Sequence, residues 1–296
     1  MLRVARTPWR DTLHMLISDV RRSSRFWSLI AQLLLVMLTW ITPGYGMAQD
    51  AGAMLTPSPQ TFHPWQVPPP QGAVQAYFVN LNIDDKIETP FLVKFGLAGG
   101  WGLAPIAAPT GGKSGHHHLL VNRELPLDFK KPLPFNEQYI HFGKGQMETV
   151  LNLAPGKYTL RLLLADDKHL PHFVYSKPVA VTVVKKNPVD PATLLKKGIS
   201  VSLAADTVKA PFRVQFHASG LNVGHAVQKQ KDTGHFKLTV SPSKGADAVL
   251  DFFNGQTEVW LSPPAGEYTF RLEFLDNANP GRALADTVTT SARVQQ

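Results

Sequence analysis

Histidine is concentrated in one part of this 296-residue chain. Eleven histidines occur, and six of them lie between residues 116 and 172. Cysteine is absent, which excludes thiol catalysis and thiolate metal sites. Imidazole clusters without thiolates suit Cu(II), Zn(II) or Ni(II), and such sites generally favour Cu(II). We therefore predict a divalent transition-metal site, with Cu(II) or Zn(II) as its ion. The candidate ligands are His116, His118, His141, His169 and His172.

The chain contains an internal repeat, so positions in one copy can be compared with positions in the other. The sequence PFLVKF at residues 90–95 recurs as PFRVQF at residues 211–216. The longest match joins residues 145–162 to residues 255–272 in a single register without gaps. This match predicts two copies of one structural unit.

Alternation in the second copy assigns the first histidines to the faces of a strand. The run FKLTV at residues 236–240 places its apolar side chains on one face, which is the core face. By the same parity, His117 points into the core of the first copy, and His116 and His118 point outward. We expect His117 to be a buried, hydrogen-bonded histidine. Residues i and i+2 of a strand lie about 6.6–7 Å apart, so His116 and His118 can converge on one ion.

The other candidate ligands lie at turns, where the second copy carries different residues. His141 ends a strand before a glycine, and His169 and His172 flank Pro171 in a loop. The equivalents in the second copy are Lys237 for His118, Asp251 for His141, Asn279 for His169, Arg282 for His172 and His235 for His116. Only one of these equivalents is a histidine. Folding of the repeat therefore does not require the other four imidazoles.

Other interpretations of the histidines stay open. They fit a structural or interaction domain without metal, or a patch that recognises an anionic component of the cell envelope. A metal-dependent hydrolase would need three protein ligands and an open position. The chain lacks Gly-x-Ser-x-Gly, phosphate-loop and His-Glu-x-x-His motifs. Because Glu148 and Asp166 recur as Glu258 and Asp276, these carboxylates indicate framework roles, and we expect a protein that is not an enzyme.

The elements that must position the histidines are strands. Short runs alternate apolar and polar residues between glycine, proline, asparagine and aspartate, and no long helical period follows residue 72. A turn followed by Tyr158 in the first copy and by Tyr268 in the second resembles the tyrosine corner of immunoglobulin-like sandwiches. We predict an all-β protein of two tandem immunoglobulin-like β-sandwich domains, at residues 74–184 and 199–296, joined by a linker at 185–198.

The N-terminal segment, 1–48, has the three parts of a secretory signal peptide. An arginine-rich stretch precedes an apolar run at residues 26–41, and Gly46 and Ala48 fit the positions before a cleavage site. We expect cleavage between Ala48 and Gln49, with either Met1 or Met15 as the start, and hence a periplasmic or secreted protein. The alternative is an uncleaved anchor, although the apolar run is shorter than the roughly 20 residues of a spanning helix. Residues 49–73 are proline-rich and predict an extended spacer.

The formal net charge of +8 does not indicate a nucleic-acid-binding protein. Six arginines and two aspartates in the segment 1–48 account for +4, which leaves +4 spread over the rest. A nucleic-acid-binding domain should carry a clustered basic face with stacking aromatic residues, and the sequence has no such cluster. We expect no nucleic-acid partner and no stable membrane span after cleavage.

Three motifs resemble one known family. They are GHHHLLV at residues 115–121, HFGKGQ at residues 141–146 and DDKHLPH at residues 166–172. Together they resemble, in order and spacing, the bacterial exported domain of unknown function 4399, over roughly residues 74–184. The second copy keeps the framework and departs at nearly every histidine. The resemblance implies export and a small β domain, and it implies no particular activity. We therefore expect an exported binding module of the cell envelope.

Overall fold

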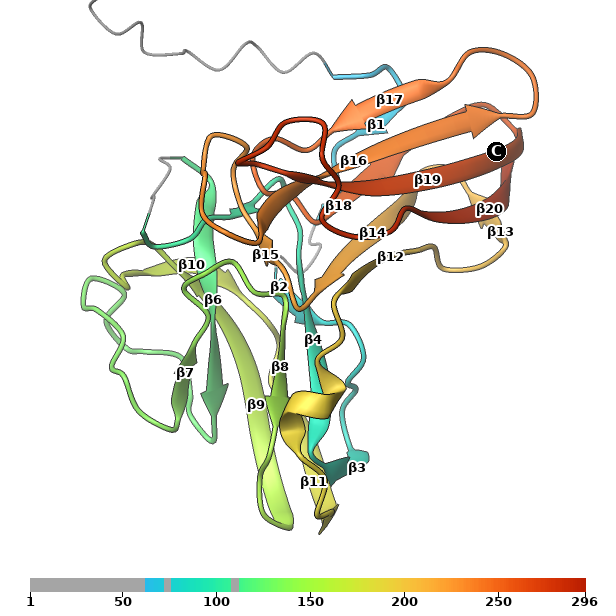
Figure 1. The fold of residues 1–296 in the computed structure, drawn as a ribbon. Helices are drawn as coiled ribbons and strands as arrows, with labels where there is room; N and C mark the ends of the chain where they lie inside the picture. The colour runs from blue at the N-terminus through green and yellow to red at the C-terminus, as the bar shows by residue number, and fades with distance from the viewer. Residues whose placement is uncertain (1–61, 72–75, 108–111) are drawn as a thin grey trace, which may run out of the picture. The chain divides into compact units, whose positions relative to one another are not determined.

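The computed structural model describes residues 62–71, 76–107 and 112–296 (Figure 1). The predicted signal peptide and most of the proline-rich segment lie outside the described residues. The described part is all-β: its strands are joined by turns and by one 3₁₀-helix, η1 (Pro191–Leu194), in the predicted linker. No helix among the described residues is long and apolar enough to cross a membrane. Gln60–Gln296 form one compact unit.

The first repeat consists of two sheets. The strands of the larger sheet are β3 (Asp85–Thr89), β5 (Gly102–Leu103), β6 (Ser114–Val121), β7 (Tyr139–His141), β9 (Gly156–Ala165), β10 (Pro171–Tyr175) and β11 (Val179–Lys186). Their order is β3-β11-β9-β6-β5, with β7 paired to β6 and β10 paired to β9. The smaller sheet contains β2 (Ala76–Phe78), β4 (Phe91–Leu97) and β8 (Glu148–Leu151), in the order β2-β4-β8.

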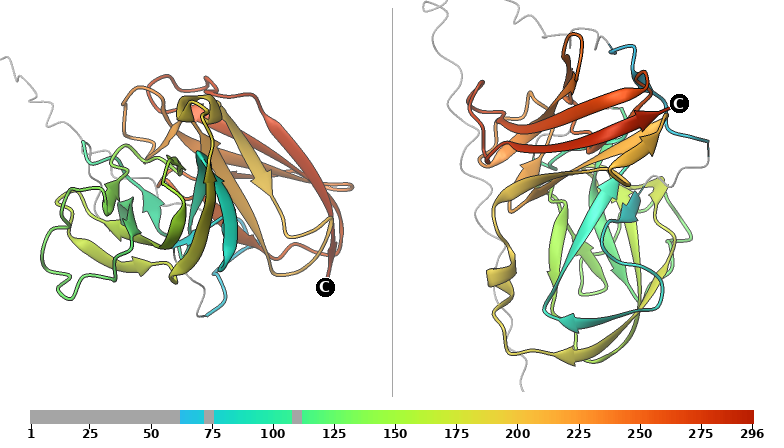
Figure 2. Two further views of the ribbon diagram at one scale, coloured as in Figure 1. Left: turned by 90° about the horizontal axis from the view of Figure 1, so that it is seen from below. Right: turned by 90° about the vertical axis from the view of Figure 1, so that its right-hand side faces the viewer.

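The second repeat has the same arrangement. The strands of its larger sheet are β13 (Thr207–Lys209), β15 (Asn222–Val223), β16 (Thr233–Pro242), β17 (Ala248–Asp251), β19 (Gly266–Asp276) and β20 (Val288–Gln295). Their order is β13-β20-β19-β16-β15, with β17 paired to β16. The smaller sheet contains β12 (Gly198–Ser202), β14 (Phe212–Ser219) and β18 (Glu258–Leu261). Figures 1 and 2 show the two pairs of sheets, the first in teal to yellow and the second in gold to red.

Apolar side chains from facing sheets fill the core of each repeat. In the first repeat, the ring of Phe95 on β4 lies 5.5 Å from that of His117 on β6. In the second, the ring of Phe216 on β14 lies 5.3 Å from that of Phe236 on β16. Burial of these apolar surfaces is the main stabilising contribution to such a sandwich. The prediction of two tandem β-sandwiches is confirmed.

The tyrosine corner is present in both repeats. The hydroxyl of Tyr158 donates to the carbonyl of Ala154 at 3.0 Å, and that of Tyr268 donates to the carbonyl of Pro264 at 2.9 Å. In each case the tyrosine ties the turn that enters the strand to a backbone position four residues earlier. This local feature is typical of immunoglobulin-like sandwiches.

The proline-rich segment differs from the expected spacer at one place. Gln66–Val67 form a short strand, β1, which pairs antiparallel with β18 of the second repeat. These two residues therefore belong to a sheet, whereas the sequence predicted a spacer throughout this segment. Pro68, Pro69 and Pro70 follow them immediately, and proline lacks the N–H that a longer pairing would need.

The two repeats contact each other through equivalent residues. The Leu103 amide donates to the Gly255 carbonyl, and the Val223 amide donates to the Gly145 carbonyl, each at 2.9 Å. Gly145 and Gly255 have φ angles of 87° and 72°. A Cβ at Gly145 would lie 2.0 Å from the carbonyl oxygen of Val223, and one at Gly255 would lie 2.3 Å from that of Leu103. The glycines are therefore required both for their backbone conformation and for the close approach of the repeats.

Two carboxylates at equivalent positions also join the repeats. Glu148 accepts hydrogen bonds from His217 at 2.9 Å, from Ser219 at 2.7 Å and from the Gly220 amide at 3.1 Å. Glu258 accepts one from the hydroxyl of Tyr77 at 2.6 Å. Each carboxylate thus contacts the opposite repeat, as expected for framework residues. The predicted domain boundaries remain a prediction.

Candidate metal centre

Three segments of the first repeat bring four histidines together. His116 and His118 lie on β6, and the antiparallel register of β6 and β7 places His141 directly opposite His118. His169 comes from the turn between β9 and β10. Because strand residues i and i+2 share a face, His116 and His118 reach the same side of the sheet. Four of the five predicted ligands therefore meet at one point.

The ligand atoms of these four histidines lie close enough to share one ion. One nitrogen from each of His116, His118, His141 and His169 lies within 4.8 Å of the others. The Nε2 atoms of His116 and His118 are 2.9 Å apart, and those of His141 and His169 are 3.3 Å apart. Within the described residues, this is the group of histidines and carboxylates with metal-binding geometry.

The inner two histidines point away from the core, as predicted, and they are nevertheless fully buried. His116 and His118 each have 0% exposure. The alternation of faces was predicted correctly, because His117 packs in the core beside Phe95. The outer face is buried as well, because the segment that follows β6 covers it with Leu133, which packs against Leu120 and neighbouring residues in a second small apolar cluster.

Burial keeps the inner imidazoles neutral. Desolvation, with a smaller contribution from the neighbouring histidines, lowers the pKa of His116 to about 2 and that of His118 to about 3. Desolvation and the nearby His169 also lower the pKa of His141. Neutral imidazole is the form that binds metals, so the inner ligands are in their binding form well below neutral pH.

The hydrogen bonding of the inner pair is incomplete without a further partner. Each Nε2 faces the other, and both Nδ1 atoms are buried without a hydrogen-bond partner. A neutral imidazole has one donor and one acceptor nitrogen. Leaving a buried polar group unsatisfied costs about 1–3 kcal/mol. A cation bound to both Nε2 atoms would replace their single mutual contact with two metal–nitrogen bonds, with the proton of each ring on Nδ1.

The turn that carries His169 is held in an unusual backbone conformation. His169 has a φ of 62°, in the left-handed region that few non-glycine residues adopt. The carboxylate of Asp166 accepts hydrogen bonds from the amides of Lys168 at 2.9 Å and of Leu170 at 2.8 Å. Asp166 therefore organises this turn, as its recurrence in the second repeat indicated, and the turn directs the imidazole of His169 toward the other three.

His172, the fifth predicted ligand, lies elsewhere. Its Nε2 lies 3.1 Å from the carbonyl oxygen of Ser114, to which it donates, and its ring lies 4.8 Å from that of Trp101. It does not belong to the group of four. The sequence could not separate His169 from His172, because both flank Pro171 in one loop.

His117 is buried as predicted, with 1% exposure, but the predicted hydrogen bond is absent. Neither ring nitrogen has a partner within the described residues. Desolvation lowers its pKa to about 3, so the ring is neutral. His117 thus occupies a core position as a partly mismatched substitute for phenylalanine.

Phe135 contacts the outer pair of histidines and was not singled out in the sequence. Its ring lies 5.2 Å from that of His141 and 4.6 Å from that of His169, edge-on in both cases. It lies in the segment between β6 and β7, and 63% of it is exposed. The second copy carries no equivalent segment, so the repeat comparison gave no reference for it.

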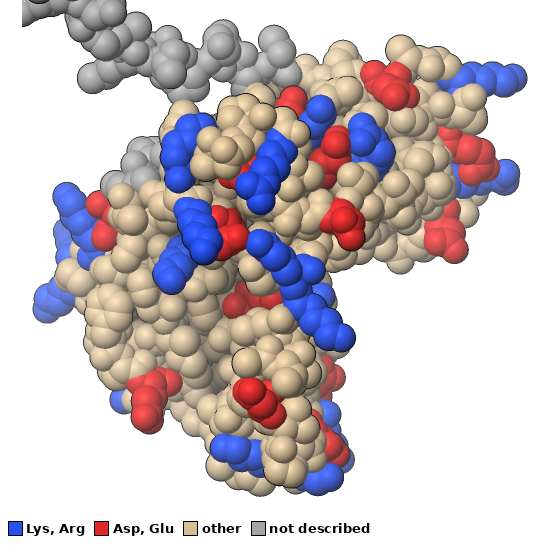
Figure 3. Space-filling view, viewed as in Figure 1, with Lys and Arg blue, Asp and Glu red and all other residues tan. Residues whose placement is uncertain are grey.

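The surface outside this cluster carries other polar features. On the face drawn in Figure 3, basic and acidic side chains alternate without a large area of one charge.

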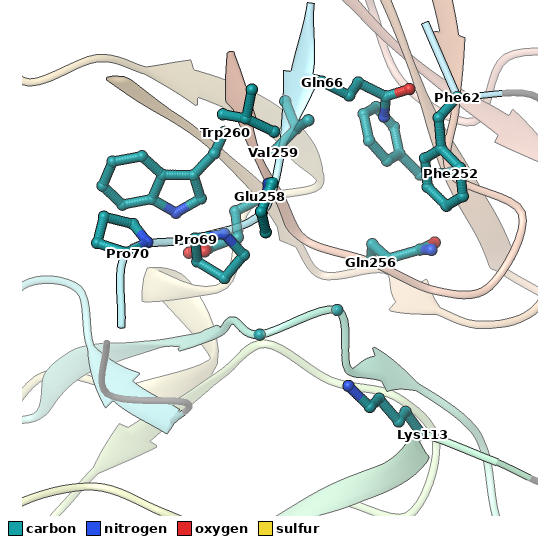
Figure 4. A pocket seen from close by; sticks show the side chains of 14 residues that line it. Phe62, Gln66, Pro69, Pro70, Lys113, Phe252, Gln256, Glu258, Val259 and Trp260 are labelled. Carbon is teal, nitrogen blue, oxygen red and sulfur yellow. The ribbon is translucent and has the colours of Figure 1, made fainter. Parts of the chain in front are cut away.

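A separate cavity of about 650 Å³ has Pro69, Pro70 and Trp260 on one side and Phe252 on the other, with Glu258 between them (Figure 4). No histidine lines this cavity, so it is distinct from the candidate metal centre.

The fold and the cluster define a tandem immunoglobulin-like protein with an all-imidazole site in its first repeat. The chain belongs to the family described as Domain of unknown function (DUF4399), which matches residues 93–184 and 214–293. The family is found in both repeats, as the three motifs and their weaker second copy predicted. No curated protein matches the sequence.

Fibronectin type III modules are among the solved structures that match the chain, all at low TM-scores. The chicken CNTN1 FN1-FN3 domains have a TM-score of 0.22 and 11% identity, over 72% of this chain and 66% of that chain. The fibronectin(III)-like modules of Clostridium thermocellum CbhA have a TM-score of 0.23 and 11% identity, over 75% of this chain and 94% of that one. A two-domain fibronectin type III segment of chicken tenascin has a TM-score of 0.22 and 11% identity, over 74% and 98%. These similarities carry no information about function.

Proposed function

We propose that this protein is an exported module of the cell envelope that binds one divalent transition-metal ion through its first repeat. The ligands are His116, His118, His141 and His169. One observation carries the proposal: a nitrogen atom from each of these four side chains lies within 4.8 Å of the other three. Export to the periplasm or cell surface is part of the proposal, and it is supported by the N-terminal sequence.

The spacing of the nitrogens suits a four-coordinate ion. Zinc–nitrogen bonds are about 2.0–2.1 Å long, which puts neighbouring ligands of a tetrahedral site about 3.3 Å apart. The Nε2 separations of 2.9 Å and 3.3 Å are close to this value. Nitrogen ligands without thiolates suit Zn(II) and Cu(II), with Cu(II) bound more tightly by the general order of affinities.

The composition of the site favours binding over catalysis. A hydrolytic zinc site keeps one position open and needs a group that accepts a proton from the bound water. Here the group contains four imidazoles and no carboxylate among the described residues. Asp166 lies three residues before His169. Its carboxylate accepts hydrogen bonds from the amides of its own turn. We therefore propose a non-catalytic role.

Titration calorimetry of the full chain, purified without a histidine tag, tests the proposal. We expect one Zn(II) or Cu(II) ion per chain. The variant His141→Asn/His169→Asn removes the two half-buried ligands, and asparagine tolerates the left-handed conformation at position 169. Because two of the four ligands are gone, it should lose affinity by about a hundredfold or more. Each tenfold loss corresponds to about 1.4 kcal/mol of binding free energy.

The matched control is His172→Asn, which removes a neighbouring imidazole outside the cluster. It should bind the ion as the unmodified chain does. Equal binding by the double variant and the unmodified chain would refute the site. Absence of stoichiometric binding in the unmodified chain would favour the alternative, a structural or interaction domain of the envelope without metal.

A further inference from the structure

One aromatic ring contacts the outer pair of histidines in the cluster. Phe135 contacts His141 and His169, the two ligands that are only half-buried, and both contacts are edge-on, with interplanar angles of 73° and 72°. His116 and His118 lie beneath them and are fully buried. Phe135 therefore lies on the side of the cluster from which water would approach a bound ion.

The segment that carries Phe135 is fixed to the cluster. The amide of Leu133 donates to the carbonyl of His169 at 2.9 Å. The side chain of Leu133 is 3% exposed and packs with Leu120 and Leu163 on the outer face of the larger sheet. These contacts place Phe135, two residues later, beside the imidazoles. The cover is thus part of the folded structure.

We propose that Phe135 sets the coordination number and metal selectivity of this site. The inference rests on the proposed metal-binding function. An apolar group beside a metal site controls solvent access to the ion. By excluding water from the outer side, Phe135 limits the ion to four imidazole ligands. This arrangement favours Zn(II), which accepts a closed tetrahedral site, over ions such as Ni(II) that complete their coordination with water.

Co(II) provides the direct test, because tetrahedral Co(II) absorbs visible light far more strongly than Co(II) with five or six ligands. The full chain loaded with Co(II) should show the intense tetrahedral spectrum. In Phe135→Ala, water should join the ion, the absorption should fall several-fold, and the preference for Zn(II) over Ni(II) should fall about tenfold. Phe135→Leu keeps an apolar cover and should retain most of the spectrum.

Phe173→Ala is the matched control. Phe173 is also an exposed phenylalanine, with 77% exposure, but it stacks on Phe129 at 4.4 Å. Its removal should leave the Co(II) spectrum unchanged.

The test variant should also fold. Because Phe135 is largely exposed, Phe135→Ala should remain folded, and circular dichroism checks this.

Each outcome distinguishes this inference from the metal-binding proposal. A weak Co(II) spectrum in the unmodified chain would overturn the closed, four-coordinate site. An unchanged spectrum and selectivity in Phe135→Ala would overturn the role of Phe135 while the metal site stands. If the unmodified chain binds none of Co(II), Zn(II) or Cu(II), the proposed function itself fails, and the inference fails with it.

Discussion

The two repeats use the same strand position for a histidine and give it opposite surroundings. His235 in the second repeat has its Nδ1 atom 2.6 Å from the side-chain oxygen of Asn277, which accepts its hydrogen bond. His116 in the first repeat faces another imidazole instead. A histidine that serves structure is paired with an oxygen, whereas the histidines of the first repeat are paired with each other. This difference points to a ligand outside the protein chain.

The neighbouring positions show the same contrast. His118 on β6 lies opposite His141 on β7. At the same register in the second repeat, Lys237 on β16 lies opposite Asp251 on β17. A lysine and an aspartate can neutralise each other without a further partner. Two imidazoles lack this complementarity. The second repeat thus carries two residues of opposite charge at the register where we propose a bound ion in the first.

A longer connection accounts for the burial of the site in the first repeat. The stretch of chain from His116 to Glu148 is longer than the equivalent stretch from His235 to Glu258, so the first copy carries additional residues between these points. The connection includes Leu133, which covers the outer face of the sheet, and Phe135, which contacts the imidazoles. The framework is shared, and the site depends on an insertion.

The largest expected effect is a loss of folding stability in acid. The pKa values of His116, His117 and His118 are lowered to about 2, 3 and 3, mainly by burial. In the unfolded chain these groups titrate near the ordinary histidine pKa of about 6.5. As pH falls below that value, the unfolded chain binds protons that the folded chain does not, so stability is lost. Each histidine lowers the free energy of unfolding by about 1.4 kcal/mol per pH unit, and the three together lower it by about 4 kcal/mol per pH unit.

Urea unfolding of the metal-free protein, in the presence of a chelator, measures this effect. The free energy of unfolding should fall steeply between about pH 6.5 and about pH 5. His117→Phe should reduce the slope by one proton. A free energy that stays flat over this range would show that the three imidazoles are accessible to protons in the folded state, which contradicts their burial.

Much of this architecture could be predicted from the sequence, and the missing parts have physical causes. The repeat, the strands and the tyrosine corners depend on local patterns, so Tyr158 and Tyr268 identified the fold. The burial of His118 depends on residues far away in the sequence. A signal was nevertheless present: Leu163 is apolar on the outer face of β9, where the second copy has Glu273.

The second expected difference concerns the core position shared by His117 and Phe236. His117→Phe removes two buried nitrogens without partners and should stabilise the protein by about 1 kcal/mol, because an unsatisfied buried polar group costs about 1–3 kcal/mol and the larger ring takes back part of the gain. The reciprocal change, Phe236→His, should destabilise by about 3 kcal/mol through lost burial and a new unsatisfied group.

Urea unfolding at about pH 7.5, above the ordinary histidine pKa, separates these effects from protonation. The metal affinity of His117→Phe should be unchanged, since this side chain lies on the core face. If His117→Phe abolished metal binding in a folded protein, the assignment of faces to ligands would be wrong. Equal destabilisation by both variants would show that the core of the first repeat is fitted to an imidazole.

The third expected difference is stabilisation by metal. A ligand that binds only the folded state at a concentration of about a hundred times Kd stabilises it by about 2.7 kcal/mol. Zn(II) should therefore raise the midpoint of thermal unfolding of the unmodified chain. The variant His118→Lys/His141→Asp carries the residues of the second repeat and should show no such increase. An equal rise in this variant would place the bound ion outside the cluster.

The two framework carboxylates also differ, although they occupy equivalent strand positions. Burial alone would raise the pKa of Glu148, but hydrogen bonds from His217 and Ser219 bring it below its ordinary value. Burial raises the pKa of Glu258, and the hydrogen bond from Tyr77 does not fully offset this effect. The folded structure therefore favours the charged form of Glu148 and disfavours that of Glu258.

The smallest expected difference follows from this contrast between the carboxylates. Glu148→Gln should destabilise by about 1.5 kcal/mol, since it removes hydrogen bonds to a charged acceptor. Glu258→Gln should destabilise less than Glu148→Gln does, because the charged form that it removes is already disfavoured in the folded structure. Urea unfolding at about pH 7.5 compares the two variants where both carboxylates would be ionised in the unfolded chain. Equal losses of stability in the two variants would mean that Glu148 and Glu258 contribute equally to the contact between the repeats, and would contradict the contrast in their pKa shifts.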